Sequence, residues 1–208
     1  MPEAKSLLQR HAEYYTKNMG LRVFPCNGKT PATSHGCKDA TTDPAQVAEW
    51  WGGGSTYNVA IATGNGLVVL DVDTNHDAGK FGDENLADLE QQYGPLPETW
   101  TCLTGGGGVH YYFQCDDPAL TVAAGFAPGL DYRGAGGYVI APPSIHPTTG
   151  RAYEWEASST PTSIPLAPLP DWLHRLMLQS KKDKPKQAKS KEAPGKVTEG
   201  RRNEEMFH

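Results

Sequence analysis

Residues 67–73 read LVVLDVD, an apolar run that ends in two aspartates. Valine and leucine dominate the run, which predicts a buried β-strand. Because side chains alternate along a strand, we expect Asp71 and Asp73 to point to the same face. Two close carboxylates repel each other unless a cation lies between them, and Mg²⁺ or Mn²⁺ is the natural guest. The alternative is a pair of solvated aspartates at a strand end.

The segments on either side of this run predict more strands than helices, which favours an α+β or mixed α/β fold. Gly20 is expected to end the first helix, and Asp43-Pro44 to begin the second with an N-cap and a proline in the first turn. Residues 27–42 have a loop-like composition. We expect helices over residues 4–18, 44–51, 83–93 and 170–178, and strands over residues 21–25, 58–63, 67–73, 100–104, 109–115, 130–132, 138–141 and 152–155.

The charge is distributed unevenly along the 208 residues, whose formal net charge is −5. Residues 180–208 contain nine Lys or Arg and five Asp or Glu, so they carry +4 and residues 1–179 carry −9. This disfavours nucleic-acid binding by charge alone in the first 179 residues and leaves room for a site that collects cations. We expect a folded domain over 1–179, a Lys/Pro-rich disordered linker over 180–198 and the start of a truncated C-terminal helical element over 199–208.

Several classes of protein are disfavoured by what the sequence lacks. It has neither an apolar run of about 18 residues nor a secretory signal, so we expect a cytoplasmic protein without a membrane segment. The spacing of Cys26, His35 and Cys37 matches no common zinc module, and no zinc is expected. There is also no GxxxxGK[ST] motif of a P-loop ATPase.

Two further segments carry candidate functional residues. In LTGGGGVHYYF, residues 103–113, glycines such as Gly107 and Gly108 allow close approach of a ligand and can present N–H groups to anions. His110 follows them and can hydrogen-bond a phosphate oxygen. The alternative is a flexible hairpin loop with a structural histidine.

In GLDYRGAGGYVIAPPS, residues 129–144, Asp131 and Arg133 alternate around a tyrosine and are expected on one face. A carboxylate beside a guanidinium suits a metal site with a phosphorylated substrate. A surface ion pair followed by a turn is the alternative. Lys29, in NGKTP, is a candidate phosphate contact, although most loop lysines are only solvated.

Taken in this order, the segments resemble the N-terminal primase-polymerase (prim-pol) domain of bifunctional replication proteins from plasmids and phages, in the archaeo-eukaryotic primase superfamily. The resemblance runs from about residue 15 to residue 155 and also includes GLRVFPCNGKTP and GCKDATTDPAQVAEWW. It implies an α/β subdomain packed on an RRM-like β subdomain, with the active site between them. Residues carried over by position are the metal-binding carboxylates Asp71, Asp73 and Asp131, the triphosphate contact His110, and the phosphate contacts Arg133, Lys29 and Ser144.

The resemblance further implies template-directed addition of nucleotides to a 3′-hydroxyl by two-metal-ion phosphoryl transfer, with release of pyrophosphate. The cofactors would be Mg²⁺ or Mn²⁺, and the substrates dNTPs or NTPs on a single-stranded DNA template with a primer. A helicase or helical-bundle domain would follow in the full-length protein, in a bacterial or phage-infected cell. Two alternatives stay open: a nucleotide-sugar glycosyltransferase with a DxD motif, which leaves GGY-x-x-APPS unexplained, and a catalytically silent nucleotide- or DNA-binding initiator module.

Overall fold

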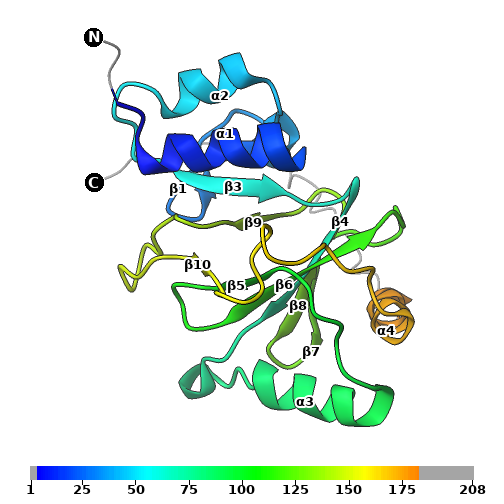
Figure 1. Cartoon of the computed structure of the whole chain (residues 1–208). Helices are drawn as coiled ribbons and strands as arrows, with labels where there is room; N and C mark the ends of the chain where they lie inside the picture. Colours follow the sequence, from blue (N-terminus) through cyan, green and yellow to red (C-terminus); the bar gives the residue numbers. More distant parts are fainter. Residues whose placement is uncertain (1–3, 183–208) are drawn as a thin grey trace, which may run out of the picture.

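The computed structural model describes residues 4–182, apart from the side chains at positions 123, 124, 181 and 182. In this part of the chain, four α-helices accompany two antiparallel sheets (Figure 1). This mixed arrangement agrees with the predicted α+β class. The helices are α1 (Leu7–Met19), α2 (Pro44–Trp51), α3 (Gly82–Tyr93) and α4 (Asp171–Lys182), with two short 3₁₀ helices, η1 (Gly36–Asp39) and η2 (His76–Ala78).

The smaller sheet has four strands in the order β2-β1-β3-β9, and the larger has six in the order β10-β5-β6-β4-β8-β7. The strands of the smaller sheet are β2 (Thr30–Pro31), β1 (Val23–Asn27), β3 (Asn58–Ala62) and β9 (Tyr138–Ile140). Those of the larger sheet are β10 (Glu154–Trp155), β5 (Thr101–Leu103), β6 (Val109–Cys115), β4 (Gly66–Val72), β8 (Leu130–Arg133) and β7 (Ala123–Ala127). The RRM-like character of the larger unit stays a prediction.

The two helices over the smaller sheet have the predicted caps at Gly20 and Asp43, but α1 begins at Leu7 and not at the predicted residue 4. Ser6 caps α1, because its hydroxyl accepts a hydrogen bond from the Gln9 N–H, and Gly20 ends the helix in the left-handed conformation with φ +65°. Asp43 caps α2 through the Ala45 N–H. Figure 1 shows α1 and α2 on one side of the smaller sheet and the larger sheet on the other side.

A turn at residues 64–66 carries the chain from β3 of the smaller sheet into β4 of the larger one. All three of its residues have positive φ: +88° at Gly64, +51° at Asn65 and +92° at Gly66. A Cβ at Gly64 would also lie 2.7 Å from the Cα of Ala135, so the glycine allows a close crossing of two chain segments. The two strands joined by this turn therefore belong to different sheets.

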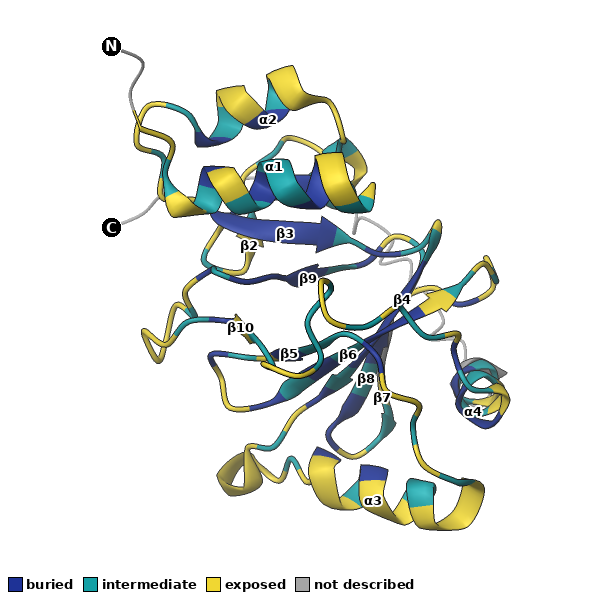
Figure 2. Ribbon diagram, in the orientation of Figure 1, coloured by how far each residue is buried: buried dark blue, intermediate teal, exposed yellow. Residues whose placement is uncertain are grey.

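Side chains of β4 alternate between two buried clusters. Val68, Leu70 and Val72 face a cluster that also contains residues of α3 and α4. Leu67 and Val69 face the other cluster, which they share with α1, α2, β1, β3 and β9. Figure 2 shows β3 and the central part of the larger sheet as buried and the outer faces of the helices as exposed. Asp73, the second aspartate of LVVLDVD, directly follows the last residue of β4.

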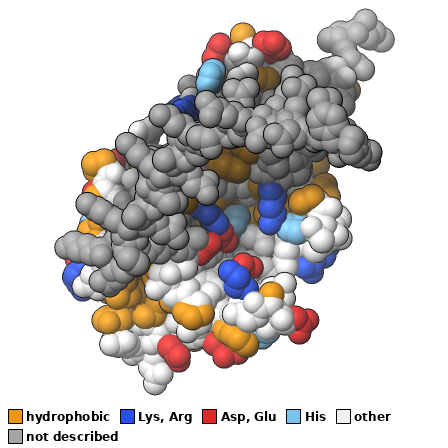
Figure 3. Space-filling model, turned by 180° about the vertical axis from the view of Figure 1, so that it is seen from behind, with side chains coloured by type: hydrophobic (Ala, Val, Ile, Leu, Met, Phe, Trp, Pro, Cys, Tyr) orange, Lys and Arg blue, Asp and Glu red, His pale blue; other side chains and the backbone are white. Residues whose placement is uncertain are grey.

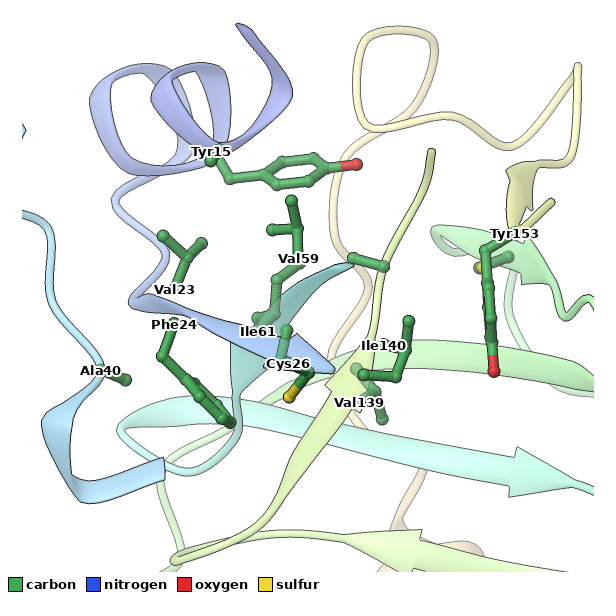
Figure 4. Close-up of a cluster of buried hydrophobic side chains, with 14 of the residues drawn as sticks. Tyr15, Val23, Phe24, Cys26, Ala40, Val59, Ile61, Val139, Ile140 and Tyr153 are labelled. Carbon is green, nitrogen blue, oxygen red and sulfur yellow. The ribbon is translucent and has the colours of Figure 1, made fainter. Parts of the chain in front are cut away.

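Figure 4 shows part of the cluster around the smaller sheet, in which Tyr15 lies over Val59 and Tyr153 stands beside Ile140 at the edge. Tyr15 is fully buried and its hydroxyl donates to the Pro142 carbonyl at 2.6 Å. Burial raises the pKa of this hydroxyl far above its ordinary value. The cluster thus fixes the residues around Pro142 against α1.

Some sequence-based boundaries were wrong. The short strand β2 lies inside the segment predicted as a loop, and β7 was not predicted. Both are edge strands that pair with one neighbour only, and the alternation of apolar residues that identifies a strand is weak in them. Helix α4 continues to Lys182, so the predicted domain end at 179 falls inside a helix. The rest of the predicted linker and the predicted C-terminal element lie outside the described residues. Within residues 4–182, no helix has both the length and the apolar character needed to cross a membrane.

Candidate active site

Three of the predicted site residues form one row across the middle of the larger sheet. On β4, Asp71 is paired directly with His110 of β6 on one side and with Asp131 of β8 on the other. Direct cross-strand partners carry their side chains on the same face. Because Val69, two residues before Asp71, packs in the cluster that contains β1, β3 and β9, this row also faces the smaller sheet. Residues far apart in the sequence are thereby brought together.

Arg133 joins the two carboxylates of this row. Its Nη2 donates to Asp71 Oδ2 at 3.0 Å and to Asp131 Oδ2 at 3.2 Å. The prediction that Asp131 and Arg133 share a face is confirmed, and the ion pair extends to a third residue on the neighbouring strand. The side chains are only 21–28% exposed, which distinguishes the group from an ordinary surface ion pair. The guanidinium offsets the repulsion between the carboxylates.

Asp71 is the centre of the electrostatic group. Burial alone would raise its pKa, but hydrogen bonding and charge from His110, followed by those from Arg133, outweigh burial and hold the pKa of Asp71 well below its usual range. The His110 Nε2 lies 3.4 Å from Asp71 Oδ1, and the His110 side chain is only 8% exposed. Its Nδ1 is buried with no hydrogen-bond partner among the described residues. In this arrangement His110 contacts Asp71, and its predicted contact with a triphosphate stays a prediction.

Asp73 is set apart from the other two carboxylates. It follows the last residue of β4, its side chain is 55% exposed, and its Oδ2 lies 3.8 Å from Lys80 Nζ. Asp131 is held more firmly, since its Oδ1 accepts a hydrogen bond from the Gly125 N–H. Over residues 4–182, no three His, Cys, Asp or Glu side chains are grouped closely enough to hold a metal ion. The three predicted metal ligands are therefore not assembled into one group here.

The pair formed by Asp71 and Asp131 nevertheless fits a divalent cation in its chemistry. Both supply carboxylate oxygens, the ligands that Mg²⁺ and Mn²⁺ prefer. The positively charged Nη2 of Arg133 lies between them and marks the point where a positive charge is best stabilised. Asp73 lines the same cavity and is a third oxygen donor at its rim.

The row opens into two adjoining hollows of about 390 and 420 Å³. One extends along β9 and Tyr153, and the other is the more polar and extends toward the glycine loop and the segment around His146. Lys29 lines both, and its carbonyl accepts from the Tyr138 hydroxyl at 3.0 Å. Its contact with phosphate stays a prediction. Figure 3 shows basic, acidic and histidine side chains close together on one face of the molecule. The five residues shared by both hollows are Lys29, Asp71, His110, Arg133 and Tyr153.

Within the glycine loop, Gly107 and Gly108 do not turn their N–H groups toward a ligand. The Gly107 N–H donates to the Thr104 carbonyl at 3.0 Å, and the Gly108 N–H donates to the Thr104 hydroxyl at 2.9 Å. Both N–H groups are therefore used inside the turn rather than turned toward an anion. Gly107 has φ +99°, and a Cβ at Gly108 would overlap the carbonyl oxygen of Val72. These two glycines serve the turn and its close approach to the end of β4.

Comparison with known families decides the relationship of this chain. A family model described as bifunctional DNA primase/polymerase, N-terminal (Prim-Pol) matches residues 12–172. The chain belongs to the Prim-Pol family. No curated protein matches it. Prim-Pol membership indicates a DNA primase/polymerase domain with DNA and nucleotide substrates, a nucleotidyltransferase activity in general, and the use of divalent metals by the family.

One residue transferred from the Prim-Pol resemblance has another role. Ser144 is fully buried and lies outside both hollows. Its Oγ accepts from the Val59 N–H at 2.9 Å and donates to the Val59 carbonyl at 3.3 Å. The prediction that Ser144 contacts phosphate is wrong for this structure, because both hydrogen-bonding directions of the hydroxyl are used by β3. The serine ties the segment after β9 to the smaller sheet.

The sequence reasoning missed several residues that line this Prim-Pol cavity, among them Tyr153 and His146. Tyr153 is buried between two histidine rings, with centroid distances of 6.2 Å to His110 and 6.1 Å to His146. Burial, with further contributions from Cys102 and Asp71, raises the pKa of Tyr153 far above its ordinary value. His146 lines the polar hollow. The one available signal was position, since both follow directly on the APPS segment that was already part of the predicted site.

Proposed function

We propose that this Prim-Pol domain is a template-directed primase-polymerase that adds nucleotides to a 3′-hydroxyl of a primer on single-stranded DNA, with release of pyrophosphate. One observation carries the proposal: Asp71, His110 and Asp131 lie in a single row on three neighbouring strands and open into a polar cavity. Phosphoryl transfer needs carboxylates and cations at one point, because positioning and charge neutralisation supply most of the rate. Family membership counts against the glycosyltransferase alternative.

Each residue of the cavity has a role in this proposal. Asp71 and Asp131 would hold the catalytic Mg²⁺ or Mn²⁺, with Asp73 at the rim. When bound, divalent cations would neutralise phosphate charge and favour loss of the proton from the attacking hydroxyl. Arg133 would pair with a phosphate of the nucleotide. His110 keeps Asp71 oriented through the contact between Nε2 and Oδ1.

Lys29 completes the polar wall as an exposed ammonium group at the mouth of both hollows. It is free to meet a triphosphate from outside, where the exposed Asp73 would otherwise repel an anion. A replication protein of the phage or plasmid type, with a helicase or helical-bundle domain after this one, is the context in which we place the activity. The same residues serve DNA synthesis and priming, and the sugar preference is left to the assay.

Primer extension tests the proposal directly. The protein is incubated with a primed and an unprimed single-stranded template, with dNTPs or NTPs, and with Mg²⁺ or Mn²⁺. We expect extension by the wild-type protein and none by the double variant Asp71→Ala with Asp73→Ala. The matched control, Asp83→Ala with Glu84→Ala, removes two neighbouring exposed acids from α3 and keeps activity.

Two results contradict the proposal. Extension by the Asp71/Asp73 double variant at the wild-type rate shows that these carboxylates are not catalytic. Binding of DNA or nucleotide by the wild-type protein, with no extension under any of the conditions, identifies a silent initiator module instead.

A further inference from the structure

His146 has a fixed hydrogen-bonding pattern in a short hairpin over residues 146–151. Its Nδ1 accepts from the N–H groups of Thr148 and Thr149, each at 3.3 Å. An imidazole nitrogen that accepts cannot carry the hydrogen, so the hydrogen is on Nε2. Burial, followed by the charges of Lys29 and Arg151, lowers the pKa of His146, which keeps the ring neutral. His146 is therefore a neutral N–H donor whose lone pair is already occupied.

The donor atom stands over the glycine loop. A Cβ at Gly106 would lie 3.3 Å from His146 Nε2, and a Cβ at Gly105 would lie 2.5 Å from the His146 Cβ. The absence of side chains at these positions leaves room for the imidazole. The hairpin is fastened to the loop, because the Gly105 carbonyl accepts from Thr149 Oγ1 at 2.7 Å and from Arg151 Nε at 3.0 Å. The position of Nε2 is thus fixed by contacts on two sides.

The surroundings define which ligand this donor takes. A metal ion needs a free lone pair, and that of Nδ1 is used by two backbone N–H groups. A neutral N–H beside the cations Lys29 and Arg151 favours an anionic acceptor. The hollow that His146 lines also contains Arg133 and the hydroxyl-bearing residues Thr148 and Thr149. An oxygen of a phosphate group has the charge and the size that this wall accepts.

We propose that His146 donates a hydrogen bond from Nε2–H to the triphosphate of the incoming nucleotide, a role that rests on the proposed function. It acts in addition to the contact predicted for His110, since both histidines line the polar hollow. Gly106 belongs to the same subsite, since any side chain at this position would crowd the donor.

The test measures binding of dGTP in the presence of Mg²⁺ by calorimetry, together with kcat and KM for primer extension. His146→Ala is expected to raise the Kd and KM for dGTP at least about tenfold, since a hydrogen bond to a charged group is lost. His11→Ala, which removes a histidine of α1 outside the cavity, leaves both constants unchanged.

A second pair of variants separates a ligand contact from a structural one. His146→Ala with Gly106→Ser places a hydroxyl in the space that the imidazole leaves, and is expected to recover part of the affinity. His146→Ala with Gly106→Ala adds a methyl group without a donor and recovers nothing. If His146→Ala lowers the melting temperature, His146→Gln is measured as well, because its side chain has a similar length and keeps a terminal N–H. Its affinity for dGTP is then compared with that of the wild type.

Three results overturn the inference. Unchanged dGTP affinity in His146→Ala refutes it while the proposed function stands. If Gly106→Ser and Gly106→Ala restore the dGTP affinity of His146→Ala equally, or if neither restores it, His146 has a structural role. A wild-type protein that neither binds dGTP nor extends primers refutes the proposed function, and the inference fails with it.

Discussion

Replacing Asp71 by Asn removes one negative charge from the centre of the row and keeps the shape of the side chain. Two contacts are affected, the hydrogen bond from Arg133 at 3.0 Å and the approach of His110 at 3.4 Å. A hydrogen bond to a charged group contributes about 1.5–3 kcal/mol. Arg133 keeps Asp131 as a partner, and the amide oxygen still accepts from it, so we expect a net loss of about 1–2 kcal/mol in the free energy of unfolding.

This loss corresponds to a fall of about 2–8 °C in melting temperature for a domain of this size. The effect on catalysis is expected to be larger, a reduction of at least about 100-fold in kcat/KM for primer extension, because the carboxylate would hold the divalent cation that neutralises the reacting phosphate. Thermal unfolding by circular dichroism and primer extension at 20 °C, where the variant is folded, measure the two effects separately. Asp83→Asn, on an exposed pair with His76, is the control and is expected to change neither.

The pH dependence gives this prediction a second test. Because the folded-state pKa of Asp71 is lowered, its contribution to stability is fully present above the ordinary pKa of about 3.9 and is lost as the pH falls through the lower folded-state value. The stability difference between wild type and Asp71→Asn should shrink as the pH falls below about pH 4. A difference that grows on acidification below about pH 4, or a variant with wild-type activity, refutes this account of Asp71.

Three other substitutions test separate parts of the structure. Ser144→Ala leaves the buried Val59 N–H without its partner and should cost about 1–3 kcal/mol in chemical denaturation with an unchanged KM for nucleotide; a raised KM at wild-type stability would restore the phosphate contact predicted from the sequence. Arg133→Gln leaves two carboxylates facing each other, so its melting temperature at pH 7 should fall and should then rise with millimolar Mn²⁺ more than that of the wild type; equal responses to Mn²⁺ would contradict cation binding between Asp71 and Asp131. Gly108→Ala places a methyl group against the Val72 carbonyl oxygen and should destabilise the fold by about 1–3 kcal/mol; a thermal melt at the wild-type temperature would refute the packing argument.

Local features of the chain were predictable because short-range physics decides them. The caps at Asp43 and Gly20 and the apolar strand before Asp71 follow from hydrogen bonding and side-chain periodicity within a few residues. The same holds for the shared face of Asp131 and Arg133, which lie two residues apart on one strand. Side strands with few partners, such as β2 and β7, carry no comparable pattern and were missed.

The candidate site could be predicted only as a set of residue types. The motifs identified Asp71, His110 and Asp131 through a resemblance, but their meeting in one row depends on the register between β4, β6 and β8. A one-residue change of register would turn such side chains to opposite faces, and nothing local in the sequence specifies it.

The sequence by itself therefore determined the helices and the central strands, the family and the chemical character of the site: oxygen donors, cations and a histidine in a recognisable order. Only the tertiary structure decided how each of these groups is used. In that structure Arg133 lies between the two carboxylates and the Ser144 hydroxyl is hydrogen-bonded to the smaller sheet. His146 lies against the glycine loop. The physical reason is that a buried polar side chain bonds to the unpaired hydrogen-bond donors and acceptors that lie near it in the fold. Long-range packing decides which groups these are.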